Sequence, residues 1–246
     1  MATFSPSPIS STAFDGVLLV DKPAGPTSHD LVHRIRKTFR IEKVGHGGTL
    51  DPNATGLLLI LLGKGTKFSD QLMGGDKAYT GEIQLGCVTS TQDIEGEILE
   101  EHPWEQVTRE QVEVQMVARV GDQFQTPPMV SAIKMNGVPL YKLARKGQEV
   151  VRKPRFVHVF KFALTAWQPP LVGFEVHCTK GTYVRTLAHD VGDSLGCGAC
   201  LASLRRTVSG DFRVADALLF DEVLKMTPSQ LAERVIPLHQ LRGPRT

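Results

Sequence analysis

The sequence predicts an α+β protein with a mixed, largely antiparallel sheet flanked by helices. Residues 155–167 and 171–179 alternate between apolar and polar side chains, and a short turn joins them, which is typical of two antiparallel strands. Further strand patterns are followed by isolated helical patterns, such as residues 182–196. This order of elements favours the α+β class.

The first third of the chain predicts a strand, a helix and a second strand. Residues 16–23 are predicted to form a short buried strand that ends at Pro23, and Thr27 or Ser28 is placed to cap a helix over residues 29–39. A glycine-dense loop follows, and then the apolar run "GLLLIL" at residues 56–61. That run predicts a buried strand, although so short a run also fits a helix.

The middle of the chain predicts two strands and a capped helix. Residues 77–89 and 96–101 are predicted to be strands. Thr108 and Gln111 form a capping box in front of "VEVQMVARV", which predicts a helix. Asn136-Gly137 is a dipeptide typical of a hairpin turn.

The last third predicts the strand pair, two helices and their ends. Gln168, Pro169 and Pro170 join the two long strands, and Gly196 stops the helix over residues 182–196. A final helix is predicted over residues 228–235.

Length and composition indicate a globular protein. The chain has 246 residues, which suits one large domain or a domain with a small appendage. Apolar residues make up 41% and charged residues 22%, as in ordinary soluble proteins. The longest apolar run, residues 57–62, is far shorter than the roughly 20 residues that cross a bilayer. We expect residues 1–15, rich in Ser and Pro, to form a disordered tail and residues 241–246 to form a second tail.

Charge is distributed unevenly although the net charge is only +2. Residues 82–122 hold ten acidic and two basic side chains, whereas residues 134–155 hold seven basic and one acidic. Residues 31–43 hold five basic and one acidic side chain. This asymmetry fits a protein with one face for a polyanion, and it also fits ordinary solvated surface.

Two short motifs point to chemistry that the rest of the sequence does not support. Cys197 and Cys200 form a CxxC pair, but there is no second CxxC, so we expect reduced structural thiols and no metal. The tetrapeptide "GKGT" at residues 63–66 lacks the Gly-Lys-Ser/Thr ending of a phosphate loop. Nucleotide hydrolysis is therefore not predicted.

The stretch "GHGGTLDPNATG" at residues 45–56 is the strongest candidate site. Asp51 precedes Pro52, which biases it toward extended backbone, and the apolar run that follows should hold the loop against the core. A buried carboxylate needs a partner, and Arg185, in the first turn of a predicted helix, is a candidate. The alternatives are an aspartate that only forms a turn and an arginine that is only solvated.

The motifs together resemble the TruB family of tRNA pseudouridine synthases. The segments "GVLLVDKPAGPTSHDLV", "GHGGTLDPNATGLLLILLGKGTK", "KAYTGEIQLG", "QTPPMVSAIKMNGVPLYKLARKG", "KGTYVRTLAHDVG" and "LGCGACLASLRRTVSGDF" occur in the order and spacing of that family. The resemblance extends from about Gly16 to Leu238, and "GTLDP" with "GTYVRTL" is highly specific. It implies the pseudouridine synthase fold over residues 16–240, with a basic clamp inserted at residues 123–155.

The resemblance also implies an activity. Family members convert uridine 55 in the T-loop of tRNA to pseudouridine, with base flipping and without a metal or other cofactor. Asp51 is similar to the catalytic aspartate of the family, Arg185 to its partner, and Tyr79 to the tyrosine that stacks on the flipped uracil and assists proton removal.

The same resemblance implies several residues that bind the RNA. His46 matches a histidine that enters the T-loop, Leu204 an apolar wall of the uracil pocket, and Lys22 a lysine that supports the active-site loop. In the basic segment, four side chains are suited to phosphates: Arg145, Lys146, Arg152 and Lys153.

Partners and location follow from the family as well. We expect the T-arm of tRNA as the partner, with no membrane, no obligatory protein partner, a monomer, and a cytoplasmic location. Many family members continue into a small RNA-binding domain of the PUA type, whereas this sequence ends at Thr246, either as a natural short form or as a truncation. Two rival interpretations are an RNA-binding protein without catalysis and a glycosidase-like hydrolase, although a hydrolase of that kind usually uses two carboxylates.

Overall fold

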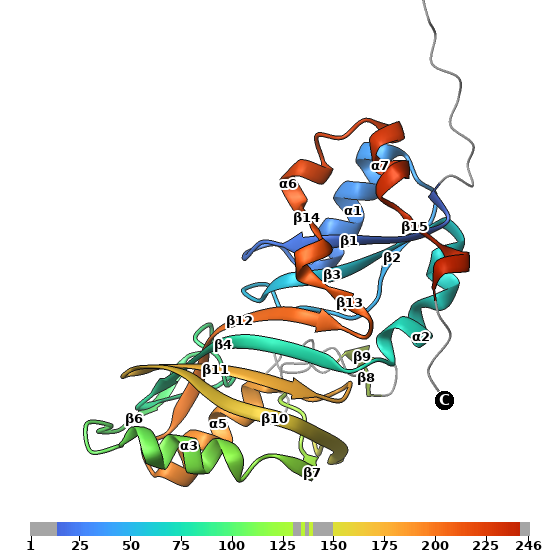
Figure 1. Ribbon diagram of the computed structural model, residues 1–246. Helices are drawn as coiled ribbons and strands as arrows, with labels where there is room; N and C mark the ends of the chain where they lie inside the picture. Colours follow the sequence, from blue (N-terminus) through green and yellow to red (C-terminus); the bar gives the residue numbers. More distant parts are fainter. Residues whose placement is uncertain (1–13, 130–133, 136–137, 140–149, 242–246) are drawn as a thin grey trace, which may run out of the picture. The chain divides into compact units, whose positions relative to one another are not determined.

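The computed structural model describes residues 14–129, 134–135, 138–139 and 150–241, and it confirms the α+β class (Figure 1). The chain forms two compact units. Unit 1 comprises residues 1–75 and 208–246, and unit 2 comprises residues 76–207. Unit 1 is therefore built from two separate parts of the sequence, and unit 2 from the part between them.

The sheet of unit 1 is built around two long strands. β1 (Gly16–Lys22) runs antiparallel to β3 (Thr55–Leu62) over seven residue pairs. β14 (Leu218–Leu219) pairs with β1 in parallel, β15 (Ile236–Pro237) pairs with β1 in antiparallel, and β2 (Val44–His46) pairs with β3. The apolar run over residues 56–61 is thus a strand and not a helix.

Alternation along β1 and β3 buries both faces of this sheet. Leu18, Val20, Leu58 and Ile60 belong to one apolar cluster, together with helix α1 (Ser28–Phe39). The intervening residues of both strands form a second cluster on the other face: Val17, Leu19, Leu57, Leu59 and Leu61. Burying one such side chain stabilises the folded state by roughly 1.5–3 kcal/mol, so the pair of strands is strongly held.

Helix α1 begins where the sequence predicts. The side chain of Thr27 accepts a hydrogen bond from the backbone of Asp30, and the carboxylate of Asp30 accepts one from the backbone of Thr27. The predicted C-terminal helix is α7 (Pro228–Arg234), which has an equivalent capping box. The other short elements of unit 1 are η2 (Gly63–Phe68), α2 (Ser69–Met73), β13 (Phe212–Arg213), η3 (Val214–Asp216), α6 (Phe220–Val223) and η4 (Leu238–Gln240).

Unit 2 contains a five-stranded part of the sheet in the order β12, β4, β11, β10, β7. Their bounds are β12 (Ala199–Ser209), β4 (Lys77–Leu85), β11 (Leu171–Cys178), β10 (Arg155–Gln168) and β7 (Gly121–Gln125). The predicted pair β10 and β11 is antiparallel, as are β11 with β4 and β10 with β7. The last two residues of β12 belong to unit 1.

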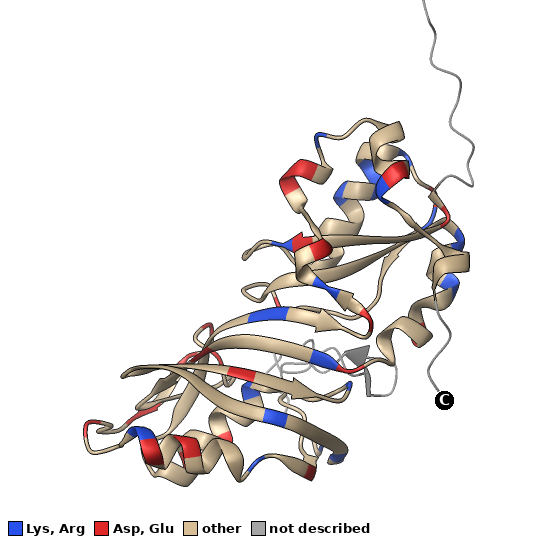
Figure 2. Cartoon of the chain, viewed as in Figure 1, with Lys and Arg blue, Asp and Glu red and all other residues tan. Residues whose placement is uncertain are grey.

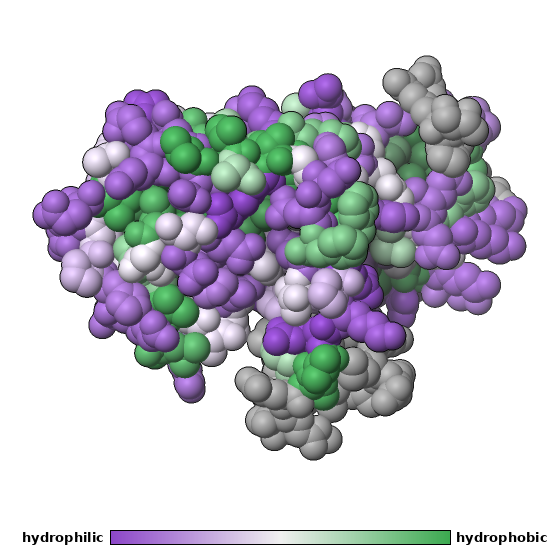
Figure 3. All heavy atoms as spheres, turned by 90° about the horizontal axis from the view of Figure 1, so that it is seen from below, coloured by the Kyte–Doolittle hydropathy of each residue, from purple (hydrophilic) through white to green (hydrophobic). Residues whose placement is uncertain are grey.

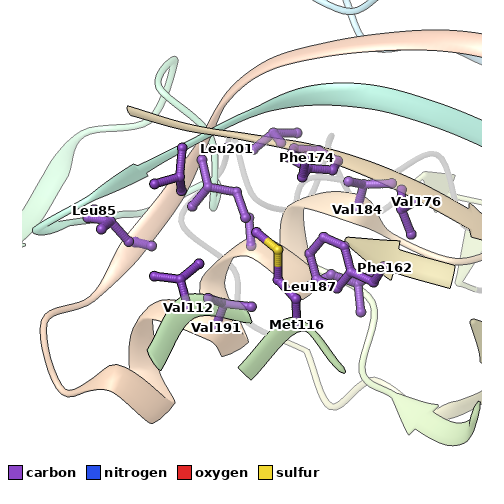
Figure 4. Packing of buried hydrophobic residues seen from close by; sticks show 14 of the residues in the cluster. Leu85, Val112, Met116, Phe162, Phe174, Val176, Val184, Leu187, Val191 and Leu201 are labelled. Atoms are coloured by element: carbon purple, nitrogen blue, oxygen red, sulfur yellow. The ribbon is translucent and has the colours of Figure 1, made fainter. Parts of the chain in front are cut away.

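Two helices cover one face of the strands in unit 2. Helix α3 (Arg109–Val117) begins at the predicted capping box of Thr108, and α5 (Val184–Leu195) ends at Gly196 in the left-handed conformation. Apolar side chains of both helices meet those of the strands in one core (Figure 4). Phe162 and Phe174 form an edge-to-face pair there, with ring centroids 5.6 Å apart.

Small hairpins complete unit 2. Residues 77–89 are not one strand, because Gly86 adopts a φ of +82° and divides them into β4 and β5 (Cys87–Thr89). β5 pairs with β6 (Ile98–Glu101). β8 (Lys134–Met135) pairs with β9 (Val138–Pro139), as the hairpin prediction requires, whereas Asn136 and Gly137 themselves lie outside the described residues.

The surface carries the charge asymmetry of the sequence. Figure 2 shows acidic residues on the β6 hairpin and on α3, and basic residues on α1. Figure 3 shows hydrophobic areas scattered over a mainly hydrophilic face. Among the described residues, no helix is both long enough and apolar enough to cross a membrane.

Candidate active site

The loop that carries Asp51 lies in unit 1 between β2 and β3, and backbone bonds fix it at both ends. The N–H of Gly47 donates to the carbonyl of Leu59 at 2.8 Å, which anchors the start of the loop on β3. The N–H of Ala54 donates to the carbonyl of Asp51 at 3.1 Å and closes a turn. Asp51 is partly exposed at this turn.

Ser28 and Gly25 hold the residues on either side of Asp51. The hydroxyl of Ser28 donates to the carbonyl of Leu50 and accepts from its N–H, at 3.1 and 2.9 Å. The N–H of Gly25 donates to the carbonyl of Pro52 at 3.0 Å. Since Ser28 begins α1, the helix and the loop are joined directly in front of the aspartate.

Lys22 is fully buried beneath the same loop. Its ammonium group donates to the carbonyl oxygens of Pro52 and Ala54, both at 2.7 Å, and to that of Pro23 at 2.9 Å. Hydrogen bonds from a charged donor contribute about 1.5–3 kcal/mol each. The contact supports the expected role of Lys22, because it fixes the backbone directly after Asp51.

Two glycines explain the composition of the loop. Gly48 adopts a φ of +113°, a conformation that other residues rarely tolerate. A Cβ atom on Gly47 would lie 3.2 Å from the Cβ of Leu59, so this position also needs a small residue. His46 precedes them at the end of β2 and is partly exposed.

Arg185 lies in the first turn of α5 in unit 2, as predicted, and its side chain is almost entirely buried. Its guanidinium forms an ion pair with Asp93 at 3.1 Å and also donates to the carbonyl of Thr91 at 3.3 Å. Asp93 was not identified from the sequence. The two residues are 92 positions apart, so spacing gives no sign of their contact.

The turn that carries Asp93 is itself firmly held. The hydroxyl of Thr91 and the N–H of Glu95 donate to one oxygen of the Asp93 carboxylate, at 2.5 and 3.1 Å. The N–H of Ile94 donates to the carbonyl of Leu201 on β12 at 3.1 Å. Asp93 therefore presents its other oxygen to Arg185 from a fixed position.

Gln125 anchors the residue just before α5. Its side-chain oxygen accepts from the N–H of Tyr183 at 2.7 Å, and its side-chain nitrogen donates to the carbonyl of Tyr183 at 3.0 Å. Gln125 is buried at the end of β7. It thus holds the start of the helix that places Arg185.

Tyr79 and Leu204 lie on the neighbouring strands β4 and β12 and pack against the core of unit 2. The side chain of Tyr79 is hydrogen-bonded to that of Arg206, a buried arginine on β12. Lys77, two residues before Tyr79 on β4, is buried as well. Neither Arg206 nor Lys77 was identified from the sequence, because no local pattern marks a buried cation.

The predicted phosphate contacts are only partly described. Arg145 and Lys146 lie outside the described residues. Arg152 is partly buried and donates to the carbonyl of Pro127 at 2.9 Å, whereas Lys153 is exposed. Lys153 is thus accessible to a phosphate, whereas one nitrogen of the Arg152 guanidinium is already bonded to Pro127.

The four cysteines, Cys87, Cys178, Cys197 and Cys200, are buried free thiols, as expected. Burial raises the pKa of Cys178 to about 11 and that of Cys200 to about 12, so neither forms a thiolate near neutral pH. Within the described part of the chain, no group of three or more His, Cys, Asp or Glu side chains is arranged to hold a metal ion.

The predicted site residues therefore fall into two sets. Lys22, His46 and Asp51 belong to unit 1, where Lys22 holds the loop of Asp51. Tyr79, Arg185 and Leu204 belong to unit 2. The predicted pair of Asp51 and Arg185 would join the two units and stays a prediction.

Similar sequences point to one family. Residues 36–184 match the profile of the TruB family pseudouridylate synthase (N terminal domain), and residues 185–241 match the tRNA pseudouridylate synthase B C-terminal domain. The tRNA pseudouridine synthase B of Opitutus terrae is 52% identical over 92% of this chain and 94% of that protein. The protein of the same name from Endomicrobium trichonymphae is 43% identical over 91% of this chain and 96% of its own length.

Solved structures share the fold. A Cbf5 complex with Nop10 and Gar1 contains a chain with a TM-score of 0.73 and 29% identity, matched over 94% of this chain and 62% of that one. An archaeal box H/ACA Nop10–Cbf5 complex gives a TM-score of 0.67 at 26% identity, over 93% and 60% of the two chains. This chain therefore has the pseudouridine synthase fold, and it belongs to the TruB family of pseudouridylate synthases.

Proposed function

We propose that the protein converts uridine 55 in the T-loop of tRNA to pseudouridine, with Asp51 as its catalytic carboxylate. The observation that supports this most directly is the immobilised loop of Asp51. Lys22, Gly25 and Ser28 hold the backbone on both sides of the aspartate. A catalytic group must be held close to its working position, and these bonds restrain the backbone on both sides of Asp51.

The reaction is an isomerisation that consumes nothing. The bond between N1 of uracil and C1′ of ribose breaks, the uracil turns, and C5 forms a new bond to C1′. C5 then loses its proton, and N1 takes one up. Atoms and electrons balance without a cofactor, so side chains of the protein suffice for the chemistry.

Each of the other site residues receives a role in this proposal. The target base has to be flipped out of the folded loop, which costs a few kcal/mol, and stacking on Tyr79 offsets part of that cost. His46 fills the space in the RNA, and Leu204 borders the uracil. Arg185 pairs with Asp51 in the assembled site and keeps the carboxylate ionised.

The first test maps the product. The protein is mixed with a tRNA transcript, and pseudouridine is located at single-nucleotide resolution. We expect modification at position 55 alone, and none in a transcript with cytidine there. Modification elsewhere, or free uracil as product, would contradict the proposal; free uracil would instead indicate a hydrolase.

The second test removes the carboxylate. Asp51→Asn should abolish product while tRNA affinity stays within about tenfold, or 1.4 kcal/mol. Asp211→Asn is the matched control, since Asp211 is an exposed turn aspartate of the same unit. Substantial turnover by Asp51→Asn would remove this residue from the chemistry.

The basic segment is proposed to position the RNA through phosphates. Replacement of Arg145, Lys146, Arg152 and Lys153 together by glutamine should raise KM more than it lowers kcat. The slope of log affinity against log salt should flatten by about 0.7–0.9 for each phosphate that the variant no longer neutralises. An isolated T-stem-loop hairpin should react nearly as well as whole tRNA, and a hairpin that goes unmodified would show that other parts of the tRNA are essential.

We propose further that the enzyme acts in the cytoplasm as a monomer without a protein partner. Light scattering of the protein with and without tRNA tests the stoichiometry. A single copy per tRNA is expected, and activity that depends on an added protein would contradict this part of the proposal.

A further inference from the structure

A buried cationic pair lies beside Tyr79 in unit 2. Arg206 on β12 is 2% exposed, and Lys77 on β4 is 6% exposed. β4 and β12 are neighbours in the sheet. Lys77 lies two residues before Tyr79 on β4, so the two side chains lie on the same face of that strand. Figure 2 shows basic residues on both strands.

Burial of these two cations is costly by itself. Transfer of a charged group into a dry interior costs several kcal/mol unless an opposite charge or good acceptors compensate. Desolvation lowers the pKa of Arg206, and the hydrogen bond with the side chain of Tyr79 acts in the opposite direction. The contact with Tyr79 therefore stabilises the charged guanidinium, and by reciprocity the guanidinium stabilises negative charge on the phenol oxygen.

Lys77 is the second of the two buried cations. Burial, and after it the charge of Arg206, lower the pKa of Lys77 to about 8. Asp76 and Cys178 act to raise it, while Lys180 acts to lower it. With a pKa near 8, Lys77 is mostly charged at neutral pH, so Arg206 has a second buried cation close to it.

We propose that Arg206 is the positioning residue of Tyr79 and stabilises the phenolate form of Tyr79 that removes the proton from C5. This inference rests on the proposed function. The phenolate oxygen takes the proton of C5 after the bond between C5 and C1′ has formed. The electron pair of the C5–H bond restores the double bond between C5 and C6, and N1 gains a proton from solvent while Tyr79 returns its proton to solvent.

The chemistry offers a substrate that separates this step from the rest. 5-Fluorouridine has fluorine in place of the proton at C5, so its rearrangement ends before any proton removal. Loss of Arg206 should therefore slow the conversion of uridine and leave the conversion of 5-fluorouridine unchanged. Removal of one preorganised donor to a developing negative charge typically lowers a rate by about 10²–10³, which sets the expected size.

The experiment compares single-turnover rates on two tRNA transcripts, one with uridine and one with 5-fluorouridine at position 55. For Arg206→Gln we expect a rate on uridine at least about 100-fold lower and a rate on 5-fluorouridine within about threefold of the unaltered protein. Deuterium at C5 should then give a primary isotope effect in the variant. Arg206→Lys, which keeps the charge but not the planar fork, should recover part of the uridine rate.

Arg205→Gln is the matched control on the same strand, one position away and therefore on the opposite face. It should leave the ratio of the two rates unchanged, whatever it does to RNA binding. Thermal unfolding of each variant shows whether it folds. If Arg206→Gln does not fold, Arg206→Lys keeps the test decisive.

The possible outcomes separate this inference from the proposed function. If the unaltered protein makes no pseudouridine, the proposed function fails. If it does, and Arg206→Gln either matches it on both substrates or slows both equally, the inference about Tyr79 is overturned. Asp51→Asn should be inactive on both substrates, because it blocks the steps that precede proton removal from C5. It therefore serves as the reference for a defect in those steps.

Discussion

Arg185 and Asp93 form an ion pair at 3.1 Å in which the two side chains are only 6% and 14% exposed. A buried pair of this kind is costly to break from one side, since the remaining charge is left without compensation. The turn of Asp93 is tied to Thr91, Glu95 and β12, so the pair fixes where the guanidinium can point.

Asp93→Asn should therefore lower both stability and activity. We expect a loss of about 3 kcal/mol in the free energy of unfolding and at least about a tenfold lower kcat, with tRNA affinity little changed. Urea unfolding and steady-state kinetics measure these effects. Glu97→Gln, an exposed carboxylate of the same hairpin, serves as control, and a fully active Asp93→Asn would show that Arg185 needs no such partner.

Lys22→Met tests the support of the Asp51 loop. Methionine fills the space of the lysine stem but leaves three carbonyl oxygens, those of Pro23, Pro52 and Ala54, without the ammonium donor. We expect the free energy of unfolding to fall by about 2–4 kcal/mol and hydrogen exchange of residues 47–54 to accelerate. Lys64→Met should change stability by less than about 0.5 kcal/mol, because the Lys64 side chain is 63% exposed in its pair with Asp15. Equal effects of the two substitutions would contradict the proposed role of Lys22.

Gln125 provides a test that depends on pH. Gln125→Glu can still accept from the N–H of Tyr183, but an ionised carboxylate cannot donate to the carbonyl, so the variant should be destabilised by about 2 kcal/mol or more at pH 7. Burial should raise the pKa of the new carboxyl, and its protonated form can donate as the amide does. The loss in the free energy of unfolding, relative to the unaltered protein, should therefore become smaller as the pH falls from 7 to 5. Urea unfolding at several pH values measures it. Gln125→Met should show a deficit that is independent of pH.

The stability that Lys77 contributes should also depend on pH, but it should improve as the pH rises, whereas that of Gln125→Glu improves as the pH falls. Its pKa is about 8 in the folded protein against an ordinary value of 10.5, so the folded state binds fewer protons than the unfolded state between these values. Stability due to Lys77 should therefore rise with pH across that window, by up to roughly 3 kcal/mol relative to Lys77→Met. Unfolding at pH 7.5, 8.5 and 9.5 measures the difference. A difference that stays flat would show that Lys77 is not desolvated.

Local signals made much of the fold predictable. Thr108 was identified as a helix cap because its capping box with Gln111 is complete within four residues, and Thr27 is one of the two caps that the sequence offered for α1. The strands β10 and β11 were recognisable because one face of each is buried and alternation persists over many residues. Arg185 was placed in the first turn of a helix expected over residues 182–196, and the helix begins at Val184.

Elements held by polar contacts were missed for a physical reason. β12 contains the buried Arg206, which interrupts the apolar pattern that identifies a strand. β7 has the sequence "GDQFQ", and its buried residue Gln125 is satisfied by hydrogen bonds and not by apolar packing. Hydropathy patterns cannot show burial of this kind.

The candidate site was predicted in part. Asp51, Tyr79 and Arg185 were identified through the family resemblance, whereas local propensity alone also fitted a turn-forming aspartate. Asp93 escaped because its contact with Arg185 connects residues far apart in the sequence, and neither segment carries a mark of the other.

The division of unit 1 into two chain segments has a consequence for the nascent protein. One edge of β1 pairs with β14 and β15, at residues 218–219 and 236–237, and these leave the ribosome only after all of unit 2 has been made. Domains generally fold as units during synthesis, so we expect unit 2 to fold while β1 still lacks these partners. An apolar strand with an open edge pairs readily with other chains. During translation we therefore expect β1 to need protection by a chaperone until residues 218–237 have been made.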